Sequence, residues 1–177
     1  VNWDPKLLTA ISDLEVEQRD QEGSLWHIKY PIDEDEFIVV ATTRPETLLG
    51  DSAVAVHPDD SKHKNLIGKQ CKLPLVNKNI PIIADEYADP EKGSGAVKIT
   101  PAHDFNDFEV GKKHQLEFTN IFDKFAKINE NAPKRFQGLD RFEARKLILE
   151  ELTQLDLLIK EEKQEMVIPY GDRSGVV

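Results

Sequence analysis

Short apolar segments separated by turn residues dominate the first two thirds of the chain and predict a β-rich fold. Residues 25–30 alternate apolar and polar positions, as in a half-buried strand that Pro31 ends. Residues 37–42 are continuously apolar, which places this strand centrally in a sheet. Further short strands are expected between Pro, Asn and Gly positions, at residues 51–58, 72–76, 80–84 and 95–100.

Helical signals are fewer. Residues 44–50, with an early proline and a terminal glycine, predict one short helical turn. Thr100 and Pro101 suit the N-cap and first position of a helix running toward residue 114. Asp140 caps the clearest helix, in which apolar residues recur at helical spacing up to about residue 158. The pattern therefore predicts one α+β domain, rich in strands, with peripheral helices.

The two ends of the sequence suggest a piece of a larger protein. The chain of 177 residues begins with Val1 rather than Met, and its last residues are apolar, like a strand still in progress. We expect a single domain over residues 1–177, with residues 1–22 and 166–177 as connecting strands.

Composition narrows the functional classes. The 33 acidic residues exceed the 23 basic ones, and a net charge of −10 argues against a general nucleic-acid-binding module. Any RNA contact must then be local or shared with another domain. Cys71 is the only cysteine, which favours a reduced, cytoplasmic setting. No apolar run approaches the roughly 20 residues of a membrane span, so no membrane partner is expected.

Two segments, residues 41–47 and 98–108, concentrate polar side chains at the ends of predicted strands. Lys98 and Thr100 share one face of a strand, and Asp104 and Asp107 share one face of a helix. A converging cation, hydroxyls and carboxylates would suit ester hydrolysis without a covalent intermediate. The alternative, equally open from spacing alone, is that Thr100 and Asp104 serve the helix start while Lys98 pairs with a surface carboxylate.

Other chemistries find less support in the sequence. Residues 93–95, Gly-Ser-Gly, lack the ending of a phosphate-binding loop and precede a strand, so a tight turn is expected. The histidines are too scattered for a metal site, and we predict no metal. No serine lies in a nucleophile motif, which argues against an acyl-enzyme.

Residues 41–47 read Ala-Thr-Thr-Arg-Pro-Glu-Thr, and residues 98–101 read Lys-Ile-Thr-Pro. The first peptide resembles the threonine-rich peptide of the editing insertions in valyl-, isoleucyl- and leucyl-tRNA synthetases. Residues 93–108 resemble the second editing motif in its valyl form. Residues 2–5 and 171–177 resemble the points where this insertion leaves and rejoins the catalytic domain. The resemblance spans the chain, with two departures: Ser94 stands where Thr is usual, and Lys92 where some members carry an aromatic residue.

The resemblance implies a β-barrel-rich α+β editing domain with its cleft between the two motifs. It implies hydrolysis of threonine wrongly attached to tRNA(Val), with the tRNA 3′ end and the catalytic domain of the same synthetase as partners. Editing is expected to need no cofactor, ATP being used by the parent synthetase outside this segment. The implied catalytic residues are Lys98, Asp107 and Asp104, and the implied substrate-binding residues are Thr42, Thr43, Arg44, Thr47, Thr100 and His103.

Two other functions remain open at this point. One is a free-standing deacylase that acts in trans. The other is a non-catalytic module that docks tRNA or packs between domains.

Overall fold

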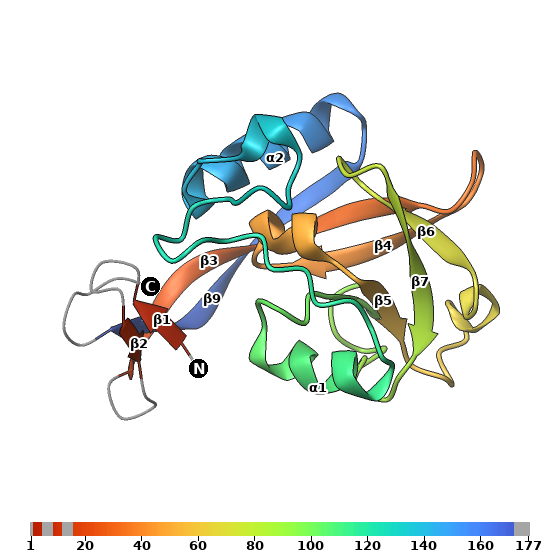
Figure 1. Ribbon diagram of the computed structural model, residues 1–177. Coiled ribbons are helices and arrows are strands. Elements are labelled where there is room, and N and C mark those ends of the chain that lie inside the picture. Colours follow the sequence, from red (N-terminus) through yellow and green to blue (C-terminus); the bar gives the residue numbers. More distant parts are fainter. Residues whose placement is uncertain (1, 5–8, 12–15, 172–177) are drawn as a thin grey trace.

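The computed structural model describes residues 2–4, 9–11 and 16–171, and it is a mixed structure of strands and helices (Figure 1). Its strands are β1 (Asn2–Asp4), β2 (Thr9–Ile11), β3 (Val16–Pro31), β4 (Phe37–Thr42), β5 (Ala53–Val56), β6 (Gln70–Leu73), β7 (Lys78–Ala84), β8 (Ala96–Ile99) and β9 (Leu158–Gly171). The helices are α1 (Phe105–Lys113) and α2 (Arg141–Gln154), with 3-10 turns η2 (Pro45–Gly50), η3 (Lys64–Leu66) and η4 (Lys134–Phe136).

The strands form a two-stranded pair β1-β2, a three-stranded sheet β4-β3-β9 and a four-stranded sheet β6-β7-β5-β8. Within the larger sheet β5 pairs parallel with β7 and antiparallel with β8. All four residues of β5 are buried, because this strand lies between two neighbours and is covered on both faces. The mixed fold is as predicted, but the described sheets are open, so the expectation of a barrel is not confirmed.

A long antiparallel ribbon of β3 and β9 is the feature that the sequence pattern revealed least. The pairing runs from Val16 opposite Gly171 to Ile28 opposite Leu158, with a register shift after His27. The predicted strand at residues 25–30 is only the last part of β3. The earlier residues of β3 do not alternate between apolar and polar positions. Backbone hydrogen bonds to β9 hold this part of the strand, and such bonds leave no periodic pattern in the sequence. The predicted connecting strands overlap this ribbon, while residues 1, 5–8, 12–15 and 172–177 lie outside the described residues.

The position predicted for β4 is wrong, although its bounds are correct. β4 lies at the edge of its sheet, and Phe37 at its start is 45% exposed. Its apolar residues are covered without a second strand partner, because Ile38 and Val40 point into the core and β8 lies alongside. The turn before β8 covers this edge, where Ser94 Oγ donates a hydrogen bond to the Val39 carbonyl.

Two helix predictions need correction at their ends. The N-cap of α1 is Asp104, not Thr100, because the Asp104 side chain accepts the backbone N–H groups of Asn106 and Asp107. α2 begins as predicted, with Asp140 and Glu143 forming a capping box. It ends at Gln154 rather than near residue 158, where β9 begins. The short turn at residues 44–50 is confirmed as η2.

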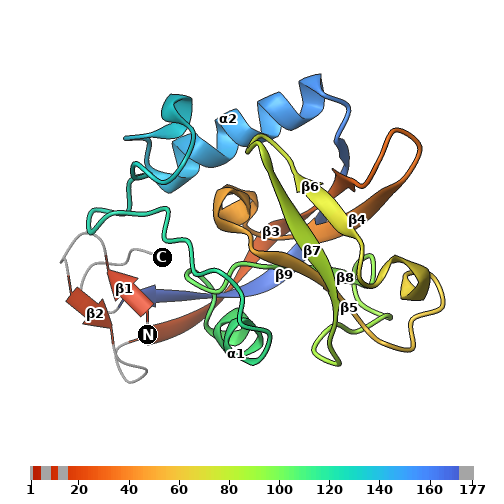
Figure 2. The ribbon, with the colours of Figure 1, turned by 45° about the vertical axis from the view of Figure 1, so that its right-hand side comes forward.

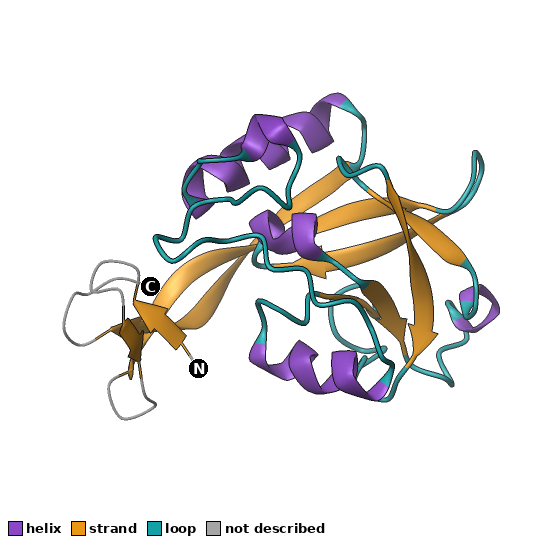
Figure 3. Cartoon of the chain, in the orientation of Figure 1, coloured by secondary structure: helices purple, strands orange, loops and turns teal. Residues whose placement is uncertain are grey.

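The main core lies between the sheets and α2, which packs against η2 (Figure 2). α2 buries Ala144, Ile148 and Leu152, which lie four residues apart on one helical face. The helices lie at the periphery of the strands, as Figure 3 shows. Among the described residues no helix is long and apolar enough to cross a membrane.

Candidate active site

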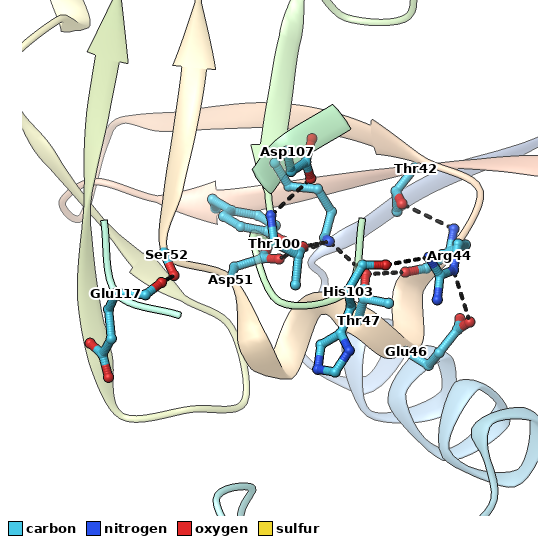
Figure 4. Close-up of polar contacts among 12 residues, drawn as sticks. Thr42, Arg44, Glu46, Thr47, Asp51, Ser52, Thr100, His103, Asp107 and Glu117 are labelled. Atoms are coloured by element: carbon cyan, nitrogen blue, oxygen red, sulfur yellow. Dashed lines mark hydrogen bonds and ion pairs between the residues drawn. The ribbon is translucent and has the colours of Figure 1, made fainter. Parts of the chain in front are cut away.

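The candidate site lies where η2 and the connection from β8 to α1 meet (Figure 4). β4 ends at Thr42 and continues into η2, while β8 ends at Ile99 and continues through residues 100–104 into α1. β4 and β8 lie beside one another. The tight turn predicted at residues 93–95 is confirmed, with Gly95 at a φ of 88° that favours glycine. The two polar segments of the sequence are thereby brought to one place.

Lys98 connects these segments through an ammonium group whose donors are all used. The residue is 7% exposed, and Nζ lies 2.7 Å from Thr47 Oγ1, 2.7 Å from Asp51 Oδ1 and within hydrogen-bonding distance of Thr100 Oγ1. An ammonium has three N–H donors, so each has one acceptor. The predicted proximity of Lys98 and Thr100 is confirmed, but the carboxylate beside Lys98 is buried rather than on the surface.

Asp51 is a functional candidate that the sequence did not reveal. It is fully buried; Oδ1 accepts the Thr100 hydroxyl at 2.7 Å, and Oδ2 accepts the Tyr30 hydroxyl. Burial raises the pKa of the Asp51 carboxyl, although the Lys98 charge lowers it. Burial likewise raises the pKa of Tyr30, which stays a donor. Removing one partner of a buried ion pair of this kind is strongly destabilising, because the other charge stays buried without compensation. In the sequence Asp51 is simply the acidic residue after η2, so only its tertiary surroundings distinguish it.

Asp107 provides a second buried carboxylate, in the first turn of α1. It is 5% exposed; Oδ2 accepts the Thr100 backbone N–H at 2.9 Å, and Oδ1 accepts the Tyr87 hydroxyl at 3.0 Å. Burial is the largest cause that raises its pKa to about 6, the Asp104 charge adds to the rise, and Lys98 lowers it. A carboxyl group with a pKa this close to neutral is typical of functional sites.

Asp104 and Asp107 share a helix start, as the spacing predicted, but their side chains differ in role. The Asp104 side chain caps α1, accepting the Asn106 N–H at 2.8 Å and the Asp107 N–H at 3.1 Å. It is half-buried, whereas Asp107 is buried. The helix-start interpretation is therefore confirmed for Asp104.

His103 is neutral and takes part in the local packing. Burial, followed by the charges of Arg44 and Lys98, lowers its pKa to about 4. Its Nε2 accepts the Ile121 backbone N–H at 2.9 Å, so the proton of the neutral ring is on Nδ1. The ring also packs edge-on against Phe122. These contacts place the ring of His103 against the segment that follows α1, while its backbone carbonyl accepts the Arg44 side chain.

Arg44 forms the outer side of the site. Its backbone N–H donates to Thr42 Oγ1 at 3.0 Å, and its side chain donates to the His103 carbonyl at 2.8 Å, which ties the two segments together a second time. The guanidinium also lies 3.8 Å from Glu46, whose carboxylate is 1% exposed and accepts two hydrogen bonds from Arg145 on α2. The Arg44 side chain is 42% exposed, so part of the guanidinium remains accessible to solvent.

The predicted site residues therefore gather at one place, although their roles stay predictions. Thr43 is half-buried and follows Thr42 at the same end of β4. Asp51, Tyr30 and Tyr87 are contributors that the sequence pattern did not indicate, because each acts on a residue far from it in sequence. The described part of the chain contains no group of His, Cys, Asp and Glu residues arranged to hold a metal ion. The candidate site instead combines threonine hydroxyls, two cationic side chains, Lys98 and Arg44, and buried carboxylates.

Comparison with known proteins places this arrangement in a family. Residues 60–139 match the family model described as "Leucyl-tRNA synthetase, editing domain". The whole chain is 61% identical to the valine–tRNA ligase of Legionella pneumophila (strain Lens), 57% to that of Francisella tularensis subsp. tularensis (strain SCHU S4 / Schu 4) and 56% to that of Dechloromonas aromatica (strain RCB). It spans 19% of the length of each of these ligases.

A solved structure shows the same fold. The LeuRS chain of the ternary complex LeuRS-tRNA-LeuAMS from Agrobacterium radiobacter K84 aligns with a TM-score of 0.61 over 85% of this chain and 20% of that chain, at 19% identity. Fold and family match define an editing domain of the aminoacyl-tRNA synthetases. The chain belongs to the valine–tRNA ligase family, as an editing domain that covers about a fifth of those ligases.

Proposed function

We propose that the chain hydrolyses the ester bond of mischarged tRNA, with threonyl-tRNA(Val) as its substrate. Valine and threonine are nearly isosteric, and the discrimination of valyl-tRNA synthetase against threonine by binding alone is known to be about 10². Translation needs a larger factor, which a second, hydrolytic site supplies. Membership of the valine–tRNA ligase family supports this assignment.

The observation that carries the proposal is the state of Asp107. Each of its oxygens accepts one hydrogen bond from the protein, whereas a carboxylate offers about four acceptor positions. Asp107 therefore retains capacity for the hydroxyl or ammonium group of a threonyl ester. A bound valyl group would cover this carboxylate with a methyl group and leave it unpaired, which costs about 1–3 kcal/mol or more for a charged group. Such a site accepts threonine and rejects valine.

The reaction needs water, a proton acceptor and stabilisation of negative charge on the carbonyl oxygen. Water attacks the ester carbonyl carbon, the bond to the tRNA 3′ oxygen breaks, and that oxygen takes up a proton. Lys98 lends positive charge to this region, but its N–H groups already have acceptors, so a direct bond to the oxyanion requires one threonine hydroxyl to give way. Arg44, being partly exposed, is placed to bind the nucleotide end of the substrate.

The proposed partners are the 3′ end of tRNA(Val) and the catalytic domain of the same ligase. The aligned LeuRS was solved with tRNA, and the chain is about a fifth of the ligases it matches. With a net charge of −10, this segment is expected to leave most phosphate contacts to other domains. ATP is consumed outside this segment, and hydrolysis here needs no cofactor.

The test measures hydrolysis of threonyl-tRNA(Val) and valyl-tRNA(Val) by this chain at raised protein concentration. Asp107→Asn is compared with Asp35→Asn, which removes an exposed carboxylate from the turn at the opposite end of β4. We expect selective loss of the threonyl ester with the wild type and the Asp35 variant, and none with the Asp107 variant. Binding of tRNA with no turnover, here and in the full-length ligase, would instead favour the non-catalytic docking module.

A further inference from the structure

Tyr87 contacts the carboxylate on which the proposed selection of threonine depends. Its hydroxyl lies 3.0 Å from Asp107 Oδ1, whereas Oδ2 is held by the Thr100 backbone N–H. The Tyr87 hydroxyl is the donor, because burial and then the charges of Asp107 and Asp104 raise its pKa and keep the phenol protonated. The two hydrogen bonds, one on each oxygen, fix the rotation of the Asp107 carboxylate.

The segment that carries Tyr87 is anchored to α1 at a second point. The Tyr87 backbone N–H donates to Asp85 Oδ1 at 2.8 Å, and Asp85 Oδ2 lies 2.8 Å from His114 Nε2 and 3.3 Å from Lys113 Nζ, at the end of α1. Ala88, next in the chain, is fully buried in the small apolar cluster that includes Val110 of α1. The Tyr87 segment therefore spans α1 from its end to its first turn.

Tyr87 also lies at the border between this buried group and solvent. The residue is 41% exposed, while the carboxylate that it contacts belongs to a residue only 5% exposed. A tyrosine of the core, such as Tyr30, buries its whole ring. Here the ring is partly open and the hydroxyl points to Asp107. The arrangement favours a role in the site over a role in the core.

We propose that Tyr87 is a positioning residue, which holds the Asp107 carboxylate in the orientation that receives the threonyl group; this role rests on the hydrolytic function proposed above. The charged and titratable groups that face Asp107 are Asp104 on the same helix, Lys98 on β8 and Tyr87 itself. Of these, Tyr87 and Lys98 favour the ionised carboxylate and Asp104 opposes it. Loss of the Tyr87 hydroxyl therefore both frees the carboxylate to rotate and raises the pKa of Asp107 above about 6.

The experiment compares Tyr87→Phe, which removes only the hydroxyl, with Tyr87→Leu, which also removes the ring. We measure kcat/KM for threonyl-tRNA(Val) and valyl-tRNA(Val) from pH 5 to 9. Both variants should shift the acid limb of the kcat/KM profile to higher pH by roughly one pH unit. Both should also reduce the preference for the threonyl ester over the valyl ester at least several-fold. An unchanged profile and preference in Tyr87→Phe, or an effect confined to Tyr87→Leu, would overturn the proposal.

A measurement without turnover separates this proposal from the function on which it rests. NMR titration of the Asp107 side-chain carboxyl in the wild type and in Tyr87→Phe reports its pKa directly. A higher pKa in the variant supports the contact even if the wild-type chain hydrolyses neither ester, in which case the proposed function alone fails. An Asp107 pKa identical in both proteins overturns the role of Tyr87, whatever the activity.

Discussion

Replacing Asp107 by asparagine should stabilise the protein at neutral pH while removing the hydrolytic activity proposed above. Burial raises the pKa of this carboxyl from 3.8 to about 6 in the folded protein. Between about pH 4 and pH 6 the folded state thus keeps a proton that the unfolded state has lost. The contribution of this group to stability is therefore full below pH 4 and is lost as the pH rises through about 6.

The size of this stability change follows from the difference between the ordinary pKa of Asp107 and its raised pKa in the folded protein. The difference between 3.8 and about 6 corresponds to about 3 kcal/mol at about 1.36 kcal/mol per pH unit. Asparagine does not titrate, so the stability of the variant relative to the wild type should rise by this amount from about pH 3.5 to pH 7.5. An opposing loss of about 1 kcal/mol is expected, because the asparagine amide has a single acceptor oxygen and can accept only one of the two hydrogen bonds that Asp107 receives from Thr100 and Tyr87. The expected net gain at neutral pH is about 2 kcal/mol.

The assay is urea unfolding of both proteins at about pH 3.5 and pH 7.5, followed by tryptophan fluorescence, with Asp35→Asn as the control for loss of an exposed carboxylate. A stability difference between Asp107→Asn and the wild type that does not change with pH would refute the reasoning. So would a variant that becomes less stable, relative to the wild type, as the pH rises. Either result would mean that burial does not raise the pKa of Asp107 in the folded protein.

Three further substitutions test the contacts that hold the site in place. Asp51→Asn should lower the free energy of unfolding by about 3–5 kcal/mol, because the buried lysine beside it loses its counter-charge; a loss below about 1 kcal/mol in urea unfolding would contradict this. Arg145→Ala should lower stability by about 2–3 kcal/mol, because Glu46 stays buried without its paired donors, and Arg145→Lys should restore only part of the melting temperature; full recovery by lysine would count against the paired geometry. Asp140→Ala should cost about 1 kcal/mol through loss of the α2 cap, whereas Asp140→Ser should cost little; equal thermal melting of the alanine and serine variants would show that the cap is not what stabilises α2.

Local sequence patterns were sufficient for the elements whose cause is local. The bounds of β4, the helical turn η2 and the capped start of α2 follow from neighbouring residues, because apolar periodicity, proline and glycine placement and capping side chains act within a few positions. The same holds for the proximity of Lys98 to Thr100, two positions apart along one extended segment. The sequence by itself thus determined the strand-rich α+β character, the two polar segments and the residues they contribute.

Tertiary structure alone decided which groups meet. Asp51 lies 49 positions from Thr100, Tyr87 lies 20 positions from Asp107, and β3 pairs with β9 across most of the chain, and no local period records any of these. The N-cap of α1 is Asp104 rather than the predicted Thr100, because the Thr100 hydroxyl donates to Asp51 and accepts from Lys98. Tertiary packing buries the carboxylates of Asp51 and Asp107, and this burial raises their pKa values. No sequence pattern measures burial, so only the tertiary structure distinguishes these two residues from ordinary acidic residues.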